Sequence, residues 1–157
     1  MKRLRYAICF FLIPAPLVAW DARVTGVVDG DSITVVHERR EIQIELAGVD
    51  CPELDQPWGD MARRFTSYLV QDKRVEIWPV YEDIGGSFFV FVFTEDINLN
   101  KALLRAGLAW HYRKYLRNSL LTALEMEARA AKKGLWSEAG PIPPWEFRQK
   151  LSDKEIP

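Results

Sequence analysis

The sequence DGDSITVVHERREIQIELAGVDCPE, which begins at Asp29 and ends at Glu53, constrains the fold of this chain more than any other stretch. Two predicted strands run through it, with Asp31 just before the first and Asp50 just after the second. A turn with the charged residues 37–40 at its tip pairs the two strands as an antiparallel hairpin. Pairing of this kind brings the carboxylates of Asp31 and Asp50 close together.

The second of these strands is half-buried. Ile42, Ile44 and Leu46 alternate with polar residues, which is the period of two typical of a strand with one buried face. The polar face carries Glu45 toward the side of the carboxylates. Such an acidic cluster repels itself unless it takes up protons or a hard cation, and oxygen ligands favour calcium over a transition metal.

The rest of the chain predicts further strands and three helices. Strands are expected over 23–28, 74–79 and 88–93, and a helix over 59–70 has an apolar stripe of Met61, Ala62, Phe65, Tyr68 and Leu69. A second helix is capped by Asn98 or Asn100 and stops at Gly107, and a third begins at Asn118 or Ser119 and stops at Gly134. Its stripe comprises Leu120, Leu121, Leu124, Ala128, Ala131 and Leu135.

A set of motifs in a fixed order indicates the family. The chain contains DGDS, LAGVDCPE, QPWG, GLAWHYRKY, EARAAKKGLW and PPWEFR, spread from about Val24 to Arg148. In this order and spacing they resemble the staphylococcal-nuclease (thermonuclease) family. The resemblance implies an α+β fold, a five-stranded OB-type β-barrel with three helices, and a calcium-dependent phosphodiesterase acting on DNA and RNA.

The resemblance also implies roles for single residues. Asp31 and Asp50 match the metal carboxylates of the family, and Cys51 stands where a main-chain carbonyl serves as a further ligand. Glu53 matches the glutamate that orients or deprotonates the attacking water. Asp29 is expected to form the turn beside the site rather than to bind the metal directly.

Two positions depart from the family pattern. Glu45 stands where the family has an arginine five residues before the second metal aspartate. Ser87, or Gly86 with a shift of one residue, stands where a second arginine closes a turn. An arginine fork binds phosphate bidentately, and loss of one such donor typically costs about a hundred- to a thousand-fold in rate.

Other side chains offer substitute contacts with the substrate. The run HYRKY interleaves aromatic and basic residues, so Tyr112, Arg113 and Tyr115 are candidates to stack a base and hold a phosphate. We expect the remaining arginines near the motifs to be solvated surface residues: Arg39 and Arg40 at the hairpin tip, and Arg63 and Arg64 on the first helix.

The first twenty residues form a separate segment. Lys2, Arg3 and Arg5 precede an apolar run, which is the pattern of a secretory signal, with an uncleaved membrane anchor as the alternative. Residues 21–150 are expected to form the nuclease-like domain, and 151–157 a loosely ordered tail. Removal of the segment takes the formal net charge from −1 to −4 and leaves Cys51 without a disulfide partner. We therefore expect an exported, periplasmic or secreted monomer.

Two functions remain open on these grounds. One is a nuclease-like domain that binds DNA or RNA weakly and is catalytically weak or degenerate, because both arginines are missing; the sequence favours this interpretation. The other is an active exported calcium-dependent endonuclease with a rearranged phosphate contact. An OB domain that only binds a partner, without metal, follows if the carboxylates lie far apart.

Overall fold

A closed barrel of five strands forms the centre of the computed structural model, which describes residues 18–155. The strands are β1 (Trp20–Val27), β2 (Ser32–His37), β3 (Arg40–Leu46), β5 (Arg74–Glu82) and β6 (Phe88–Thr94). Neighbours in the order β3-β2-β1-β5-β6 are antiparallel, and β3 closes the barrel by pairing in parallel with β6. The short β7 (Ile97–Asn98) extends from β6. The expected α+β fold with an OB-type barrel is confirmed.

The β2–β3 hairpin has the expected register with a tighter turn. Ser32 pairs with Glu45 at one end of the hairpin, and His37 pairs with Arg40 at the other. Only Glu38 and Arg39 remain in the turn, and both have positive φ, at 47° and 67°. Two-residue turns of this kind match the twist of the strands that they join.

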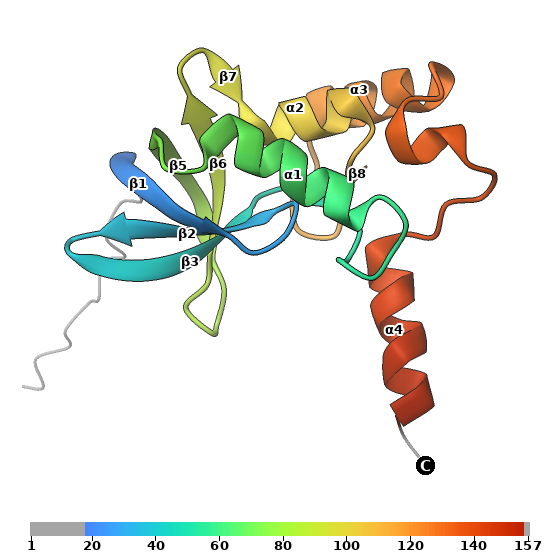
Figure 1. Ribbon diagram of the computed structural model, residues 1–157, viewed down its shortest axis with the longest axis horizontal. Helices are drawn as coiled ribbons and strands as arrows, with labels where there is room; N and C mark the ends of the chain where they lie inside the picture. The colour runs from blue at the N-terminus through green and yellow to red at the C-terminus, as the bar shows by residue number, and fades with distance from the viewer. Residues whose placement is uncertain (1–17, 156–157) are drawn as a thin grey trace, which may run out of the picture.

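Within residues 18–155 four α-helices accompany the barrel, where the sequence predicted three. They are α1 (Gly59–Val70), α2 (Leu99–Ala106), α3 (Ser119–Ala130) and α4 (Pro144–Glu155), with a 3₁₀ turn η1 (Gly134–Ser137) between the last two. Figure 1 shows α1 crossing the barrel, α2 and α3 beside it, and α4 extending away from the body. Asn98 caps α2 and Asn118 caps α3 through their side-chain oxygens, as predicted.

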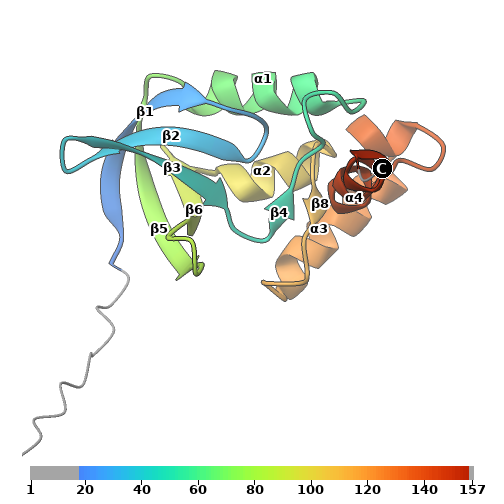
Figure 2. The same cartoon turned by 90° about the horizontal axis from the view of Figure 1, so that it is seen from below.

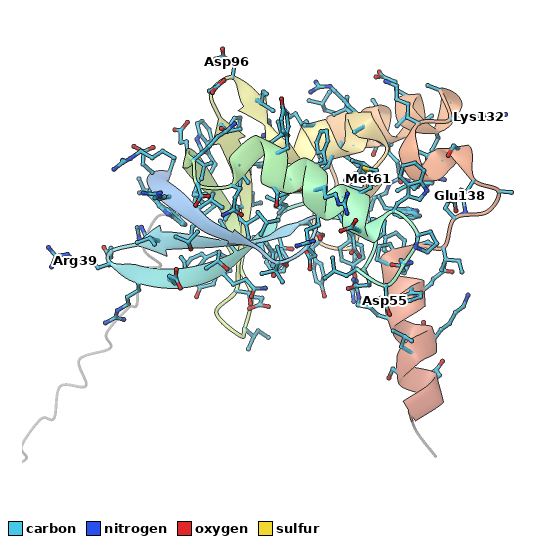
Figure 3. All side chains as sticks on the ribbon, viewed as in Figure 1. Arg39, Asp55, Met61, Asp96, Lys132 and Glu138 are labelled. Atoms are coloured by element: carbon cyan, nitrogen blue, oxygen red, sulfur yellow. The ribbon has the colours of Figure 1, made fainter. Side chains whose placement is uncertain are left out.

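The predicted apolar stripes are wrong at four positions. Met61, Tyr68, Leu120 and Ala131 are exposed, and Figure 3 shows Met61 on the outer side of α1. The buried line of α1 comprises Gly59, Ala62, Thr66 and Val70. Thr66 is tolerated there because its hydroxyl donates to the carbonyl of Gly30 at 2.6 Å, so a polar side chain occupies a position that an apolar pattern does not identify.

The third helix ends earlier than expected. α3 stops at Ala130. The buried Leu135 therefore belongs to η1 and not to α3. The chain leaves the helix at Lys132, which has a positive φ of 50°, and the N–H of Lys133 donates to the carbonyl of Ala128 at 3.0 Å. Beyond this point two main chains approach closely: a Cβ on Gly134 would lie 2.3 Å from the carbonyl oxygen of Gly107. Gly134 also has a positive φ, of 53°, which favours glycine there.

Helix α4 replaces the expected irregular tail. The segment expected to be loosely ordered, 151–157, includes the last residues of α4, at 151–155. Pro144 is the first residue of the helix, a position where proline is favoured because its missing N–H would have no helical partner. The prolines at 141, 143 and 144 therefore precede and start a helix.

The N-terminal strand begins within the segment expected to be a signal. Trp20 is the first residue of β1, and its ring packs on His37 and Phe88, with centroids 4.8 and 5.9 Å away. Residues 1–17 of that segment lie outside the described residues. Within residues 18–155, no helix combines the length and the apolar character needed to cross a membrane.

A buried amide joins the barrel to α2. Asn100 accepts the N–H of Val92 at 3.1 Å and donates to the carbonyl oxygens of Ala47 and Val90 at 2.9 and 3.0 Å. It is fully buried, between α2, β6 and the turn that follows β3. The chain continues from this turn directly into Asp50, so Asn100 fixes the position from which the acidic loop leaves the barrel.

We predict that Asn100→Ala lowers the free energy of unfolding by about 3 kcal/mol, because the substitution leaves buried partners of the amide unsatisfied. Urea denaturation of the two proteins measures the difference. Arg105→Ala, on the exposed side of α2, is the control and should change stability by less than about 0.5 kcal/mol. A loss at Asn100 no larger than that of the control would contradict the anchoring role.

Candidate active site

The β2–β3 hairpin brings the two acidic segments together. The N–H of Leu46 donates to the carbonyl oxygen of Asp31 at 2.8 Å. The N–H of Cys51 donates to Asp31 Oδ2 at 3.1 Å. Asp31 therefore links the start of β2 to the segment that carries Asp50, as the predicted pairing requires.

Asp29 shapes the turn before β2. Its Oδ1 accepts the main-chain N–H groups of Asp31 and Ser32 at 3.0 and 2.7 Å. This is the local hydrogen bonding for which aspartate is favoured in turns. Asp29 thus has the turn-forming role that was expected, and its side chain also borders the site.

Gly30 allows this turn to pack closely. A Cβ at this position would lie 2.6 Å from Cys51 Cβ and 2.8 Å from Ala62 Cβ. Real side chains do not approach so closely, so only glycine fits between the acidic segments and α1.

Asp50 and Glu53 are positioned by main-chain contacts. Asp50 ends β4 (Val49–Asp50), where it pairs with Trp110 of β8 (Trp110–His111). Glu53 donates its N–H to Gln56 Oε1 at 2.8 Å, and its carbonyl accepts the N–H of Gln56 at 2.9 Å. The backbone at Glu53 is held in this way, while its side chain is 31% exposed.

The acidic residues line one open pocket of about 280 Å³, which we call the acidic pocket. Five of the lining side chains are carboxylates and one, Arg148, is cationic. The full lining is Asp29, Asp31, Ser32, Glu45, Leu46, Val49, Asp50, Cys51, Pro52, Glu53, Phe89, Tyr112, Tyr115 and Arg148. The pocket is therefore an acidic site with aromatic walls.

Burial raises the pKa of three carboxyl groups in the acidic pocket. The pKa of Asp31 is well above its usual value because of burial and of the charges of Asp29 and Asp50. Burial also raises the pKa of Asp50, which pairing with Arg148 only partly offsets. The pKa of Glu45 is raised by burial, although hydrogen bonds from Ser32 and Gln43 oppose the shift. The pocket is therefore short of positive charge.

The donor set of the acidic pocket fits a hard cation. Among residues 18–155, no group of three or more His, Cys, Asp or Glu side chains is arranged to hold a metal ion by itself. Asp31 and Asp50 form a pair of buried carboxylates, and burial raises the pKa of both, although Arg148 pairs with Asp50. Oxygen donors of this kind suit calcium, with main-chain carbonyls or water completing the shell.

Cys51 meets the site through its main chain. Burial, followed by the charge of Asp31, raises the pKa of its thiol well above the usual value. The side chain is buried and makes no disulfide within residues 18–155. A neutral thiol is a poor ligand for a hard cation, so the main chain is the part of Cys51 that can serve the pocket.

Arg148 is the residue of the pocket that the sequence did not identify. It extends from α4 and donates to Asp50 with both Nη atoms, at 3.1 and 2.8 Å, and to Glu53 Oε1 at 2.5 Å. Hydrogen bonding to Asp50 raises the pKa of Arg148. The available signal was the motif PPWEFR, which contains Arg148 but did not indicate where the arginine points.

Two of the three predicted substrate contacts reach the acidic pocket. Tyr112 and Tyr115 line it, with ring centroids 5.5 Å apart in an edge-to-face arrangement. Arg113 turns away and donates to Glu125 of α3 at 3.1 Å. The reason is the burial of Glu125, whose carboxylate is compensated by Arg113 and Arg129.

The two residues that stand in place of the family arginines, Glu45 and Ser87, lie in different surroundings. Glu45 lines the acidic pocket and accepts a hydrogen bond from the hydroxyl of Ser32. Ser87 lies in the turn between β5 and β6, where its N–H donates to Asp83, and it is not among the lining residues. Glu45 is therefore the departure that directly changes the charge of the pocket.

The remaining arginines are surface residues, as expected. Arg63 and Arg64 pair with Asp60 on the exposed side of α1. Figure 3 shows Arg39 pointing into solvent at the opposite end of the barrel from α4.

We predict that Asp31→Asn stabilises the protein at pH 7 in the presence of chelator. The folded state raises the pKa of Asp31 above its unfolded value, so the ionised group costs stability at neutral pH. The gain should grow as the pH rises above the usual pKa of an aspartate, because only the wild-type protein carries the buried charge. As the pH falls through the raised pKa, the wild-type protein takes up a proton and gains stability, so the difference should vanish near pH 4. Denaturation from pH 4 to 8 measures it.

The exposed Asp55→Asn provides the control and should show no such trend, because Asp55 lies outside the acidic pocket. Destabilisation by Asp31→Asn across the whole pH range would show that the carboxylate is held favourably, contrary to this prediction.

Comparisons with known proteins identify the family. The family model described as "Staphylococcal nuclease homologue" matches residues 43–138. An "uncharacterized endonuclease" of Escherichia coli O157:H7 is 36% identical over 89% of this chain and 94% of its own length. An "uncharacterized endonuclease" of Haemophilus influenzae is 29% identical over 82% of this chain and 72% of its own. The "probable staphylococcal-like nuclease CAN2" of Oryza sativa subsp. japonica is 32% identical over 70% of this chain and 30% of its own. With this barrel and this acidic pocket, the chain belongs to the staphylococcal nuclease homologue family.

Proposed function

We propose that this protein is a calcium-dependent nuclease that hydrolyses phosphodiester bonds of DNA or RNA at the acidic pocket. The observation that carries the proposal is the convergence of Asp31, Asp50 and Glu53 in one open pocket walled by Tyr112 and Tyr115. The endonuclease names of its relatives support a nucleic-acid substrate.

Each acidic residue has a role in this chemistry. Asp31 and Asp50, with the main chain of Cys51, are the groups that would hold calcium. When bound, calcium would polarise the phosphate and offset the charge that develops on its oxygens. Glu53 orients the attacking water and accepts its proton, for which its partial exposure and its fixed backbone are suited.

The aromatic wall provides a place for the substrate base. Tyr112 and Tyr115 present ring faces and edges beside the carboxylates. A base that stacks on one of these rings gains about 1–3 kcal/mol and needs no particular sequence. This arrangement would hold a nucleotide with its phosphate over the carboxylates.

We expect the activity to be weak by the standard of the family. The carboxylate of Glu45 lies in the pocket near the position of the anionic substrate. At about 6 Å and an effective dielectric of about 20, two like charges repel by nearly 3 kcal/mol. A catalytically degenerate domain that keeps only the cation site is the second candidate, favoured by the pairing of Arg148 with both Asp50 and Glu53.

Cleavage of plasmid DNA and of RNA by the purified protein tests the proposal. We predict cleavage with calcium, none with chelator, and a fall of about a hundred-fold or more for Glu53→Gln, because the water loses its base. Asp55→Asn, which removes a carboxylate from the same loop outside the pocket, should keep wild-type activity. Calcium binding without cleavage of either substrate would leave the degenerate domain as the correct function.

We predict that Glu45→Arg raises the cleavage rate by about ten-fold or more, since it removes a repulsive charge and adds a phosphate donor. Glu41→Arg is the matched control, with the same change of charge on the exposed end of β3 outside the pocket. Initial rates with calcium compare the variants. Equal gains in both would mean that overall charge, and not the pocket, limits the reaction.

A further inference from the structure

The guanidinium of Arg148 donates hydrogen bonds to the carboxylate oxygens that a cation would use as ligands. Its fork takes both carboxylate oxygens of Asp50, and one of its nitrogens also reaches Glu53. The side chain of Asp50 is 8% exposed, whereas that of Arg148 is 47% exposed. A partly exposed cation is thus paired with two of the carboxylates at the centre of the proposed chemistry.

We infer that Arg148 and a divalent cation compete for Asp50 and Glu53, and that the arginine released by the cation binds the phosphate of the nucleic acid. The inference rests on the proposed function, and it assigns the phosphate contact that Glu45 and Ser87 do not provide.

Competition follows from charge and geometry. A bidentate arginine uses the same face of the Asp50 carboxylate that a cation would approach, and its positive charge repels a second cation. The cation must displace Arg148 from the carboxylates. The free energy of this pairing is therefore subtracted from the binding free energy of the cation, which lowers the affinity for the cation. The pairing seen here therefore sets a cost on cation binding.

Helix α4 allows Arg148 to leave the carboxylates without unfolding. The start of the helix is anchored, since Pro144 is buried and the ring of Trp145 packs on Trp110 and Tyr112, with centroids 6.5 and 5.3 Å away. Arg148 follows Trp145 by three residues and so lies on the same side of the helix. Figure 2 shows α4 end-on, and Figure 1 shows the rest of the helix projecting from the body. Rotation of the long side chain is enough to redirect the fork.

A phosphate is the partner that suits the released fork. The planar guanidinium matches phosphate oxygens as it matches a carboxylate. Arg148 is the one cationic side chain lining the acidic pocket, and Tyr112, which packs on Trp145, forms the wall where a nucleotide would stack. Arg148 thus lies beside the position that the proposed reaction gives to the phosphate.

Calorimetric titration with calcium tests the competition, with and without adenosine 5′-monophosphate, which has no phosphodiester link to cleave. Without nucleotide, Arg148→Ala should bind calcium about ten-fold more tightly than the wild-type protein, because no arginine must be displaced. With nucleotide, this advantage should shrink or reverse, because the wild-type arginine then gains a phosphate partner. Arg148→Lys keeps the charge but not the fork, so its calcium affinity should stay near that of the wild type and its nucleotide affinity should fall.

Lys150→Ala removes a charge from the same helix and should change neither affinity. In the cleavage assay, Arg148→Ala should lose about a hundred- to a thousand-fold in rate with calcium bound. One outcome combines tighter calcium binding by Arg148→Ala than by the wild type, seen only in the absence of nucleotide, with no cleavage of either substrate by the wild-type protein. That result would support the inference and contradict the proposed nuclease function.

An unchanged or lower calcium affinity of Arg148→Ala, equal with and without nucleotide, would overturn the inference and leave a structural ion pair. A lower melting temperature of that variant would accompany such a result. Cleavage by Arg148→Ala at the wild-type rate would overturn the phosphate contact as well.

Discussion

The amide of Asn100 connects the closure of the barrel to the geometry of the acidic pocket. Its one oxygen and two N–H donors meet β6 and the carbonyl of Ala47, so the turn after β3 is fixed three residues before Asp50. A carboxylate in its place could not donate to those carbonyls. The separation of the acidic residues is therefore set by main-chain contacts in the barrel and not by any attraction among the side chains.

This rigidity explains how the pocket holds like charges together. Asp31 and Asp50 are buried and repel each other, so ionisation of the folded protein works against its stability. The barrel, with its large buried core, tolerates that cost. In the proposed function, a bound cation would offset the repulsion between these carboxylates that folding imposes.

Local patterns in the sequence were sufficient for the strands and for the pairing that brings the carboxylates together, whereas the barrel was predicted from the family resemblance. The alternation of β3, the bounds of α1 and the caps of α2 and α3 follow from a few neighbouring residues. Met61 and Tyr68 were misplaced because their apolar spacing does not show which side of α1 faces the barrel. Arg113 was misplaced because the need of buried Glu125 for cations depends on packing that the sequence does not display.

Arg148 escaped prediction for a different physical reason. It lies 95 residues after Glu53 and on a helix with few apolar residues, so neither proximity nor periodicity connects the two. The connection depends on aromatic packing of Trp145 against Trp110 and Tyr112. Contacts between rings from distant segments are decided by the whole fold, and the motif PPWEFR carries no trace of them.

The order of synthesis gives the location of Arg148 a further meaning. Every other residue that lines the acidic pocket lies at or before Tyr115, so the ribosome produces the barrel and all five carboxylates before it produces α4. Chains fold from the N-terminal part as they emerge. The nascent barrel therefore carries its acidic residues without their arginine counter-ion until α4 is made, so the pairing of Arg148 with Asp50 and Glu53 comes late in assembly.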